Sequence, residues 1–175
     1  MYNDYKACPC PYCMSAFRYD PCPYFDEMAN RQPAAQLKDY GPQPFVINID
    51  EATSRNNNFR TTLWTGRHLQ VTLMSIKVGE DIGLEIHPNI DQFIRIESGQ
   101  GIVRMGSRKD NLNFQRNVSD GFGIMIPAGT WHNVINTGRR PIKLYSIYAP
   151  PQHPHGTVHV TKAAAQSAER EEVSE

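Results

Sequence analysis

Neither sign of charge is in excess in this sequence, and it contains no long apolar run. The 175 residues include 18 Lys and Arg and 18 Asp and Glu, so the formal net charge is zero. Nucleic-acid-binding domains usually carry a basic surface, and this class of protein is therefore not expected. No stretch approaches the roughly 18 consecutive apolar residues of a membrane-spanning helix, and the first residues lack the charged start and apolar run of a signal peptide. We expect a cytoplasmic protein that contacts neither nucleic acid nor membrane.

Cysteine is absent beyond residue 22. The four cysteines lie among prolines and tyrosines near the N-terminus: Cys8, Cys10, Cys13 and Cys22. Such a proline-rich composition buries too little apolar surface to order itself, so residues 1–43 are predicted to form a flexible arm with reduced thiols. A tetrahedral zinc site and an arm that cross-links to other proteins are the alternatives. Residues 10–13 match the redox tetrapeptide of glutaredoxins, but no strand precedes them, and redox catalysis is not expected.

Helical periodicity is lacking between residues 44 and 150, the predicted barrel domain. Short apolar or alternating runs occur there between turn residues: residues 45–49, 69–78, 83–87, 92–97, 101–105, 122–126, 132–135 and 142–149. Eight short strands at this density predict an all-β domain of two antiparallel sheets or a closed barrel. The polar stretch 107–120 is predicted to be a long hairpin loop at the barrel's edge. In the C-terminal extension, 151–175, residues 162–175 form a short helix or fray into solvent.

Five residues at fixed spacing carry the most information: Gly121, Pro127, Gly129, His132 and Asn136. The Pro-Ala-Gly sequence at 127–129 has the chemistry of a tight turn between two short apolar strands. The run after this turn alternates, so His132, Val134 and Asn136 share one face of a strand. A histidine held at a strand start and facing a barrel interior is a suitable metal ligand.

This spacing resembles the second signature motif of the cupin family at every position. The first cupin motif is matched in part: Gly79, Gly99 and the second histidine, His87, are present. Glu85 stands in place of the first histidine, and Gln92 in place of the glutamate. The resemblance covers about residues 45–150 and is greatest to small single-domain cupins similar to mannose-6-phosphate isomerase. It implies a double-stranded β-helix, the jelly-roll barrel of that family, and the likeness describes fold kinship more than activity.

The family's ligand positions correspond here to Glu85, His87, Gln92 and His132, so the resemblance implies a divalent metal ion. One carboxylate is retained, but it has changed position. Glu85 and His87 are two residues apart and point the same way on a strand, and Gln92 shares its parity with two isoleucines. Two imidazoles and a carboxylate are typical of Fe(II), and Mn, Ni, Cu or Zn can occupy the same set. The alternative is a barrel that has lost its metal.

Cupins with open metal positions can polarise an oxygen-bearing substrate, so the resemblance implies isomerase-type chemistry on a small molecule such as a sugar or keto acid. Such chemistry needs a base, and the candidates are Glu85, if it is not a ligand, Tyr145 and His155. A metal-dependent dioxygenase, which zinc would exclude, is one alternative. A barrel that binds a small molecule or a partner without turnover is the other.

Three histidines follow the last predicted strand: His153, His155 and His159. They could reach back over the barrel mouth, but a proline-pinned segment on the barrel exterior is the expected arrangement. His68 has no partner in sequence and is expected to be structural or exposed. Cupin barrels commonly pair through outer strands, and the apolar residues of 45–49 together with Trp64 could cover such an edge, so we expect a homodimer.

Overall fold

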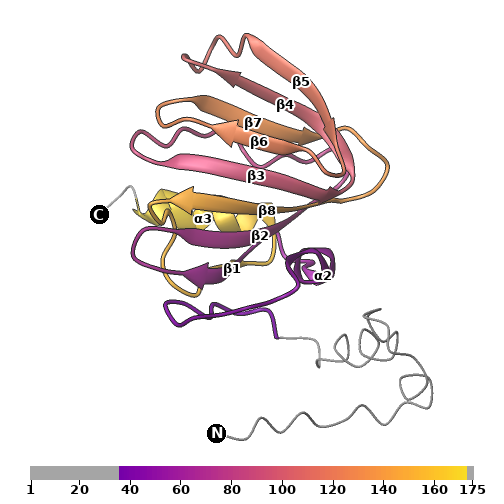
Figure 1. Cartoon of the computed structure of the whole chain (residues 1–175). Helices are drawn as coiled ribbons and strands as arrows, with labels where there is room; N and C mark the ends of the chain where they lie inside the picture. The colour runs from indigo at the N-terminus through magenta and orange to yellow at the C-terminus, as the bar shows by residue number, and fades with distance from the viewer. Residues whose placement is uncertain (1–35, 173–175) are drawn as a thin grey trace, which may run out of the picture. The chain divides into compact units, whose positions relative to one another are not determined.

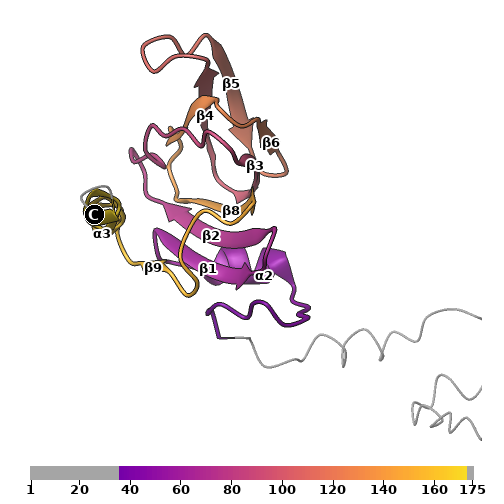
Figure 2. The same ribbon diagram turned by 90° about the vertical axis from the view of Figure 1, so that its left-hand side faces the viewer.

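The computed structural model describes residues 36–172, and the predictions for the four cysteines fall outside this range. Two antiparallel sheets make up the fold (Figures 1 and 2). The larger sheet has the order β6-β3-β8-β2-β1-β9 and the smaller one β5-β4-β7. The strands are β1 (Arg60–Thr65), β2 (Gln70–Ile76), β3 (Asp91–Ser98), β4 (Gln100–Gly106), β5 (Phe114–Ser119), β6 (Gly123–Ile126), β7 (Trp131–Asn136), β8 (Ile142–Ala149) and β9 (Val158–His159). The helices are α2 (Ile49–Arg55) and α3 (Lys162–Glu172). The predicted all-β double-stranded β-helix is confirmed.

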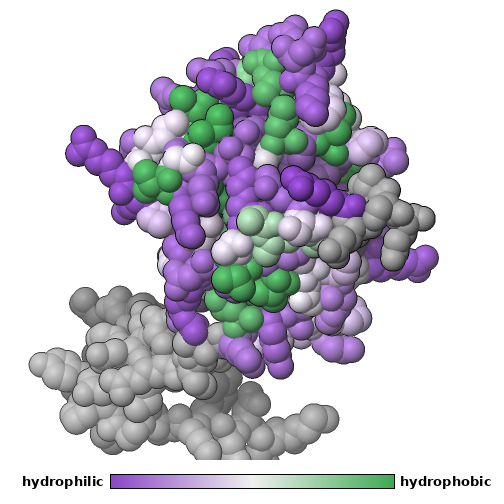
Figure 3. Space-filling model, turned by 180° about the vertical axis from the view of Figure 1, so that it is seen from behind, coloured by the Kyte–Doolittle hydropathy of each residue, from purple (hydrophilic) through white to green (hydrophobic). Residues whose placement is uncertain are grey.

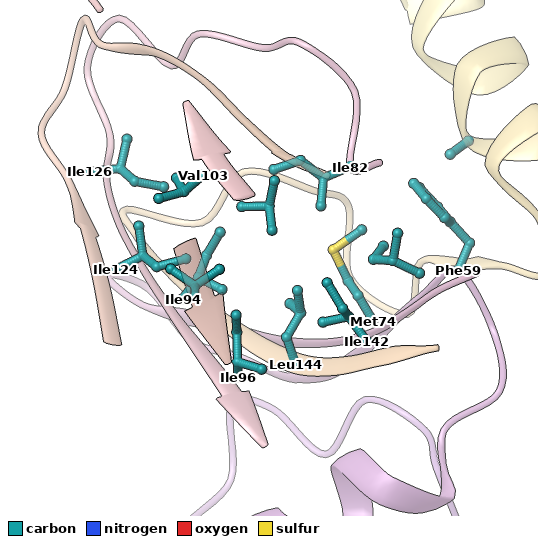
Figure 4. Packing of buried hydrophobic residues seen from close by; sticks show 14 residues of the cluster. Phe59, Met74, Ile82, Ile94, Ile96, Val103, Ile124, Ile126, Ile142 and Leu144 are labelled. Carbon is teal, nitrogen blue, oxygen red and sulfur yellow. The ribbon is translucent and has the colours of Figure 1, made fainter. Parts of the chain in front are cut away.

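The main core lies between the two sheets. Apolar side chains of both sheets, of two adjoining loops and of α3 form one buried cluster (Figure 4): Phe59, Met74, Ile76, Ile82, Ile94, Ile96, Val103, Val118, Ile124, Ile126, Val134, Ile142, Leu144 and Ala165. Strand alternation explains this arrangement, because every second residue of β3, β7 and β8 is buried. Burying each large aliphatic side chain contributes about 1.5–3 kcal/mol before the entropy cost of folding.

A second apolar cluster covers the outer face of the larger sheet. Ala52, Leu63 and Leu73 are its buried centre, and Phe45, Ile47 and Tyr145 are among the residues packed against them. The chain before β1 supplies this cover as an extended segment followed by α2. The expectations of a strand at 45–49 and of no helix in the barrel region are therefore wrong.

Helix α2 begins where the sequence supplies the groups that a helix N-terminus needs. The Asn48 side chain accepts a hydrogen bond from the backbone N–H of Glu51 at 3.2 Å, and Asp50 and Glu51 lie in the first turn. Alternation of apolar residues before Asn48 resembles a strand pattern, but these residues pack on the sheet without joining its ladder. Residues 36–43, assigned to the arm from the sequence, also take part, since the Tyr40 N–H donates to the Leu63 carbonyl at 2.9 Å.

Three further segments differ from the predictions. Strand β1 was not predicted, and β5 forms part of the region expected to be a loop. Residues 83–87 form no continuous strand but make an isolated bridge to β7, in which Glu85 pairs with His132. Of the two outcomes expected for the C-terminal residues, the short helix is observed as α3. Within residues 36–172, neither helix is long and apolar enough to cross a bilayer.

Candidate metal centre

The turn before β7 fixes the position of His132. Gly129 adopts φ of 75°, a left-handed conformation that favours glycine, and the Thr130 N–H donates to the Pro127 carbonyl at 3.2 Å. His132 follows as the second residue of β7, and it is fully buried. The predicted shared face of His132, Val134 and Asn136 is confirmed, since all three residues point inward and are buried.

The segment that carries Glu85 and His87 runs alongside β7. Glu85 and His132 exchange backbone hydrogen bonds of 3.1 and 2.9 Å, and the Gly129 N–H donates to the His87 carbonyl at 2.9 Å. These three bonds join segments more than forty residues apart in the chain. They bring the side chains of Glu85, His87 and His132 together, with ligand atoms all within 4.8 Å of one another. We call this group the triad.

The distances from the Glu85 carboxylate to the two imidazoles fit a metal ion. Glu85 Oε1 lies 3.2 Å from His132 Nε2 and 3.5 Å from His87 Nε2. Ligand atoms about 2.1 Å from a metal are separated by about 3.0 Å along an octahedral edge and about 3.4 Å along a tetrahedral edge. The two observed separations agree with these edges. A carboxylate and two imidazoles of this kind can hold a divalent ion.

The backbone sets the tautomer of His132. Its Nδ1 lies 2.9 Å from the Thr130 carbonyl oxygen, which can only accept, so Nδ1 carries the hydrogen. Nε2 lies 3.2 Å from Glu85 Oε1: with a hydrogen it donates to this carboxylate, and without one its lone pair is available to a metal ion. Proteins usually orient a metal-binding histidine in this way, through a hydrogen bond from the ring nitrogen that does not bind the metal.

Glu85 is held in its charged form. Burial alone would raise the pKa of Glu85, but hydrogen bonding with His132 and His87, together with the positive charge of Arg60, lowers this pKa well below its usual range. The carboxylate is therefore ionised at neutral pH, as metal coordination requires.

Gln92 occupies the inner face of β3 and is 3% exposed. Its Nε2 donates to Ser146 Oγ at 2.9 Å. Its Oε1 is buried and has no hydrogen-bond donor among the described residues. Gln92 pairs with Tyr148 of β8, whose ring packs against His87, so this orphaned carbonyl oxygen is suited to a metal at the triad or to a ligand bound to it. This agrees with the parity predicted for Gln92, Ile94 and Ile96, all of which are buried.

The triad lies in the polar half of the barrel interior. On β2, β3 and β8 the inward-facing residues change from apolar at one end of the strand to polar at the other. Register places Gln70 and Gln92 on either side of Tyr148, and Thr72 beside Ser146. All five are buried, and the Tyr148 ring packs edge-on against His87 at 5.6 Å between centroids. Of these five residues the sequence analysis identified only Gln92, although polar residues within the strand patterns at 69–78 and 142–149 were a usable signal.

Tyr145, predicted as a candidate base, is not brought to the triad. It alternates with Ser146 on β8 and packs in the outer apolar cluster, on the opposite face of the sheet. Tyr148 is the tyrosine that faces inward, and burial raises the pKa of Tyr148 to about 12. His155, another candidate, binds the Gly41 carbonyl at 3.1 Å and lies beside Asp39, so it also points elsewhere. His68 is exposed.

The expectation that the segment after β8 lies on the barrel exterior is wrong for His153. This ring packs edge-on against Tyr148, with 5.2 Å between centroids. Burial is the main cause that lowers the pKa of His153 to about 3, and the charges of Arg60, Glu85 and His87 also act on it. His153 therefore shares the electrostatic environment of the triad. His159 lies further along, on β9, where it pairs with Arg60.

Comparison with known proteins identifies the family. A family model described as Cupin domain matches residues 72–148. The uncharacterized protein YrkC of Bacillus subtilis (strain 168) is 73% identical over 133 residues, which cover 76% of this chain and 72% of that protein. A protein of Acanthamoeba polyphaga mimivirus is 44% identical over 121 residues, covering 69% of this chain and 74% of that one.

A solved structure gives the same result. The crystal structure of BH2720 from Bacillus halodurans has a TM-score of 0.74 and 69% identity, and the match covers 75% of this chain and 99% of that one. Together with the paired antiparallel sheets and the histidine-bearing turn before β7, these matches show that the chain belongs to the cupin family.

Proposed function

We propose that this cupin binds a divalent metal ion through Glu85, His87 and His132, with Gln92 as an additional neutral oxygen ligand. A small oxygen-rich molecule, such as a sugar or a keto acid, would bind at the open metal positions. The observation that supports this most directly is the convergence of the triad at distances that match the edges of a coordination polyhedron. The protein would act in the cytoplasm as a homodimer.

The chemistry we propose is of the isomerase type. A bound divalent ion acts as a Lewis acid that polarises a carbonyl oxygen. The residues of this chain would orient the molecule and shield it from water, since His132, Tyr148 and Gln92 are all buried. Neither Tyr145 nor His155 can serve as the base from its position, and Glu85 is committed to the triad. A dioxygenase remains the alternative if the resident metal is Fe, because the same ligand set is typical of Fe(II).

The test begins with metal content. We expect untagged protein, after reconstitution with Fe, Mn, Ni or Zn, to hold about one metal ion per chain by elemental analysis. His87→Ala or His132→Ala should lower this content several-fold, together with the metal-induced rise in Tm. His68→Ala is the matched control, because His68 is exposed and should leave both quantities unchanged.

Metal content and oxygen uptake together separate the three candidate functions. Fewer than about one metal per five chains after reconstitution, with no change in Tm, would leave a barrel that binds molecules without a metal and would refute the proposal. If the metal is present, oxygen uptake with keto acids or enediols would indicate a dioxygenase. Interconversion of hydroxy-carbonyl compounds without oxygen uptake would indicate an isomerase.

A further inference from the structure

The segment that follows β8 is fastened over the polar half of the barrel by a buried glutamine. Gln70 is fully buried, and its Oε1 accepts hydrogen bonds from the backbone N–H groups of Gln152 and His153, at 3.2 and 2.9 Å. Its Nε2 donates to the His153 carbonyl at 2.8 Å and to Thr65 Oγ1 at 2.9 Å. One side chain therefore fixes the backbone on both sides of the His153 ring.

A second anchor holds the segment a few residues later. The Asp39 carboxylate accepts from the Gly156 N–H at 3.0 Å and from Thr65 Oγ1 at 2.5 Å. The Thr157 carbonyl accepts from the backbone N–H of Thr62 at 2.9 Å. Because hydrogen bonds to the larger sheet and to Asp39 fix both ends of residues 152–157, the fold determines the position of His153.

The His153 ring is positioned to contact a molecule held at the triad. His153 and His87 both pack edge-on against the ring of the same buried residue, Tyr148, with centroid separations of 5.2 and 5.6 Å. His153 Nε2 is buried and has no hydrogen-bond partner among the described residues. A buried nitrogen without a partner costs stability unless a ligand satisfies it.

The charge of the site favours an anion. A divalent ion on the triad would be balanced within the triad by one carboxylate, Glu85, which leaves a net positive charge. Arg60 is 1% exposed, and its charge adds positive potential to the site. Burial has the largest effect on the pKa values of Tyr148 and His153, and the charge of Arg60 lowers both of them. In a partly dry interior, such a site gains far more from an anionic ligand than from a neutral one.

We propose that His153 is a ligand-contacting residue of this site, and that its Nε2–H donates a hydrogen bond to a small oxygen-rich anion, of the 2-oxo acid class, bound at the triad. This inference rests on the proposed metal site and adds the substrate class and a residue supplied by the C-terminal segment. Gln70 acts as a positioning residue, since it holds the backbone of His153 and not the ligand.

The experiment uses the full chain loaded with Co(II), whose absorption spectrum reports changes at the metal. Two probes of similar size are titrated: pyruvate, which is an anion, and hydroxyacetone, which is neutral. We expect wild-type protein to bind pyruvate at least tenfold more tightly than hydroxyacetone. His153→Ala should bind Co(II) within twofold of wild type and pyruvate about tenfold more weakly, the effect of one lost hydrogen bond.

Three further variants separate a direct contact with the ligand from a structural role. His153→Gln, which retains a donor, should recover part of the pyruvate affinity, whereas Gln70→Ala should weaken pyruvate binding and leave Co(II) binding intact. His155→Ala changes an exposed histidine of the same segment and should bind both as wild type does. If His153→Ala binds pyruvate like wild type, or if His155→Ala loses as much affinity, the contact is refuted while the metal site stands. Equal binding of the two probes by wild type would refute the anionic class, and failure of wild type to take up Co(II) would refute the proposed function and this inference together.

Discussion

Glu85 supplies the only carboxylate of the triad, and its replacement is the sharpest test at the scale of single residues. We expect Glu85→Gln to weaken Mn or Ni binding much more than Gln92→Ala, by calorimetric titration. The reason is charge: a divalent ion in a partly dry barrel gains far more from a carboxylate than from the dipole of an amide.

The double variant Glu85→His with Gln92→Glu serves as the control, since it should restore the usual family ligand set and recover metal binding. If Glu85→Gln binds as tightly as wild type while Gln92→Ala does not, Glu85 is no ligand. It would then be available as the general base.

Asn136, the last residue of the motif, has a structural role that can be tested separately. Its Nδ2 donates to the Ile76 and Arg140 carbonyls, both at 2.9 Å, and its Oδ1 accepts from the Gly138 N–H at 2.9 Å. Asn136→Ala would leave these buried backbone groups unsatisfied and should lower the unfolding free energy by about 3 kcal/mol. Chemical denaturation measures this, and metal affinity of the folded fraction should not change. A metal-binding defect without loss of stability would contradict this assignment.

At the scale of elements, the anchor of the C-terminal segment predicts a dependence on pH. Burial would raise the pKa of Asp39, but hydrogen bonds from Thr65, Gly156 and Gly41 and the charge of His155 lower it below its usual value. A carboxylate with a lowered folded pKa contributes stability above the unfolded value of about 3.9 and loses it as pH falls through the folded value.

Asp39→Asn should therefore have a lower Tm than wild type at neutral pH, and the difference should shrink as pH falls below about 4. Scanning calorimetry over this range measures it. Asp110→Asn, at an exposed carboxylate, is the matched control and should show little difference at any pH. A gap for Asp39→Asn that persists unchanged at pH 3 would show that the carboxylate charge is not what holds the segment.

The sequence predicts a site residue correctly when residues close to it in the chain determine the direction of its side chain. His132 and Gln92 were predicted correctly to point inward, because a turn and strand parity determine their direction. Tyr145 and Tyr148 were not separable, since both faces of β8 are covered and apolar residues occur on each. The position of His153 depends on Gln70, which lies 83 residues earlier, and no local pattern reports such a bond.

Elements were missed for related reasons. Strand β1 begins Arg-Thr-Thr and shows no apolar alternation, yet its first four residues are buried. Two of their polar side chains bond outside the strand: Thr61 Oγ1 donates to Asn56 Oδ1, five residues earlier, and Thr62 Oγ1 to the Thr157 carbonyl, 95 residues later. Such burial of polar residues follows from the assembled fold, whereas hydrophobic periodicity detects only segments that bury apolar faces.

For the whole molecule, a homodimer stays a prediction, but its expected surface changes. Phe45, Ile47 and Ile49 pack on the chain's own sheet and are not free to cover a neighbour. Edge strand β6 is a better candidate, since Met125 is 69% exposed and Phe122 lies just before it at 48%. On the face seen in Figure 3, polar residues divide the apolar ones into several patches rather than one broad surface.

We expect a dimer mass by light scattering at tens of micromolar, and Met125→Lys should shift it toward the monomer. Val46→Lys is the control, because Val46 is 93% exposed but lies away from β6. A monomer mass for the wild-type full chain would contradict the prediction. Dissociation by Val46→Lys alone would place the interface on the segment before α2.

The division of the barrel interior into apolar and polar halves implies a trade-off between the stability of the fold and its affinity for a ligand. Thr72 lies in the polar half, and its buried Oγ1 has no hydrogen bond of ordinary length to the described residues. Thr72→Val should therefore raise the unfolding free energy by about 1 kcal/mol while it weakens ligand binding. A lower Tm for this variant would contradict the expectation. If the polar residues on β2, β3 and β8 bind the ligand, substitutions that stabilise the barrel by making these positions aliphatic should reduce its affinity for the ligand.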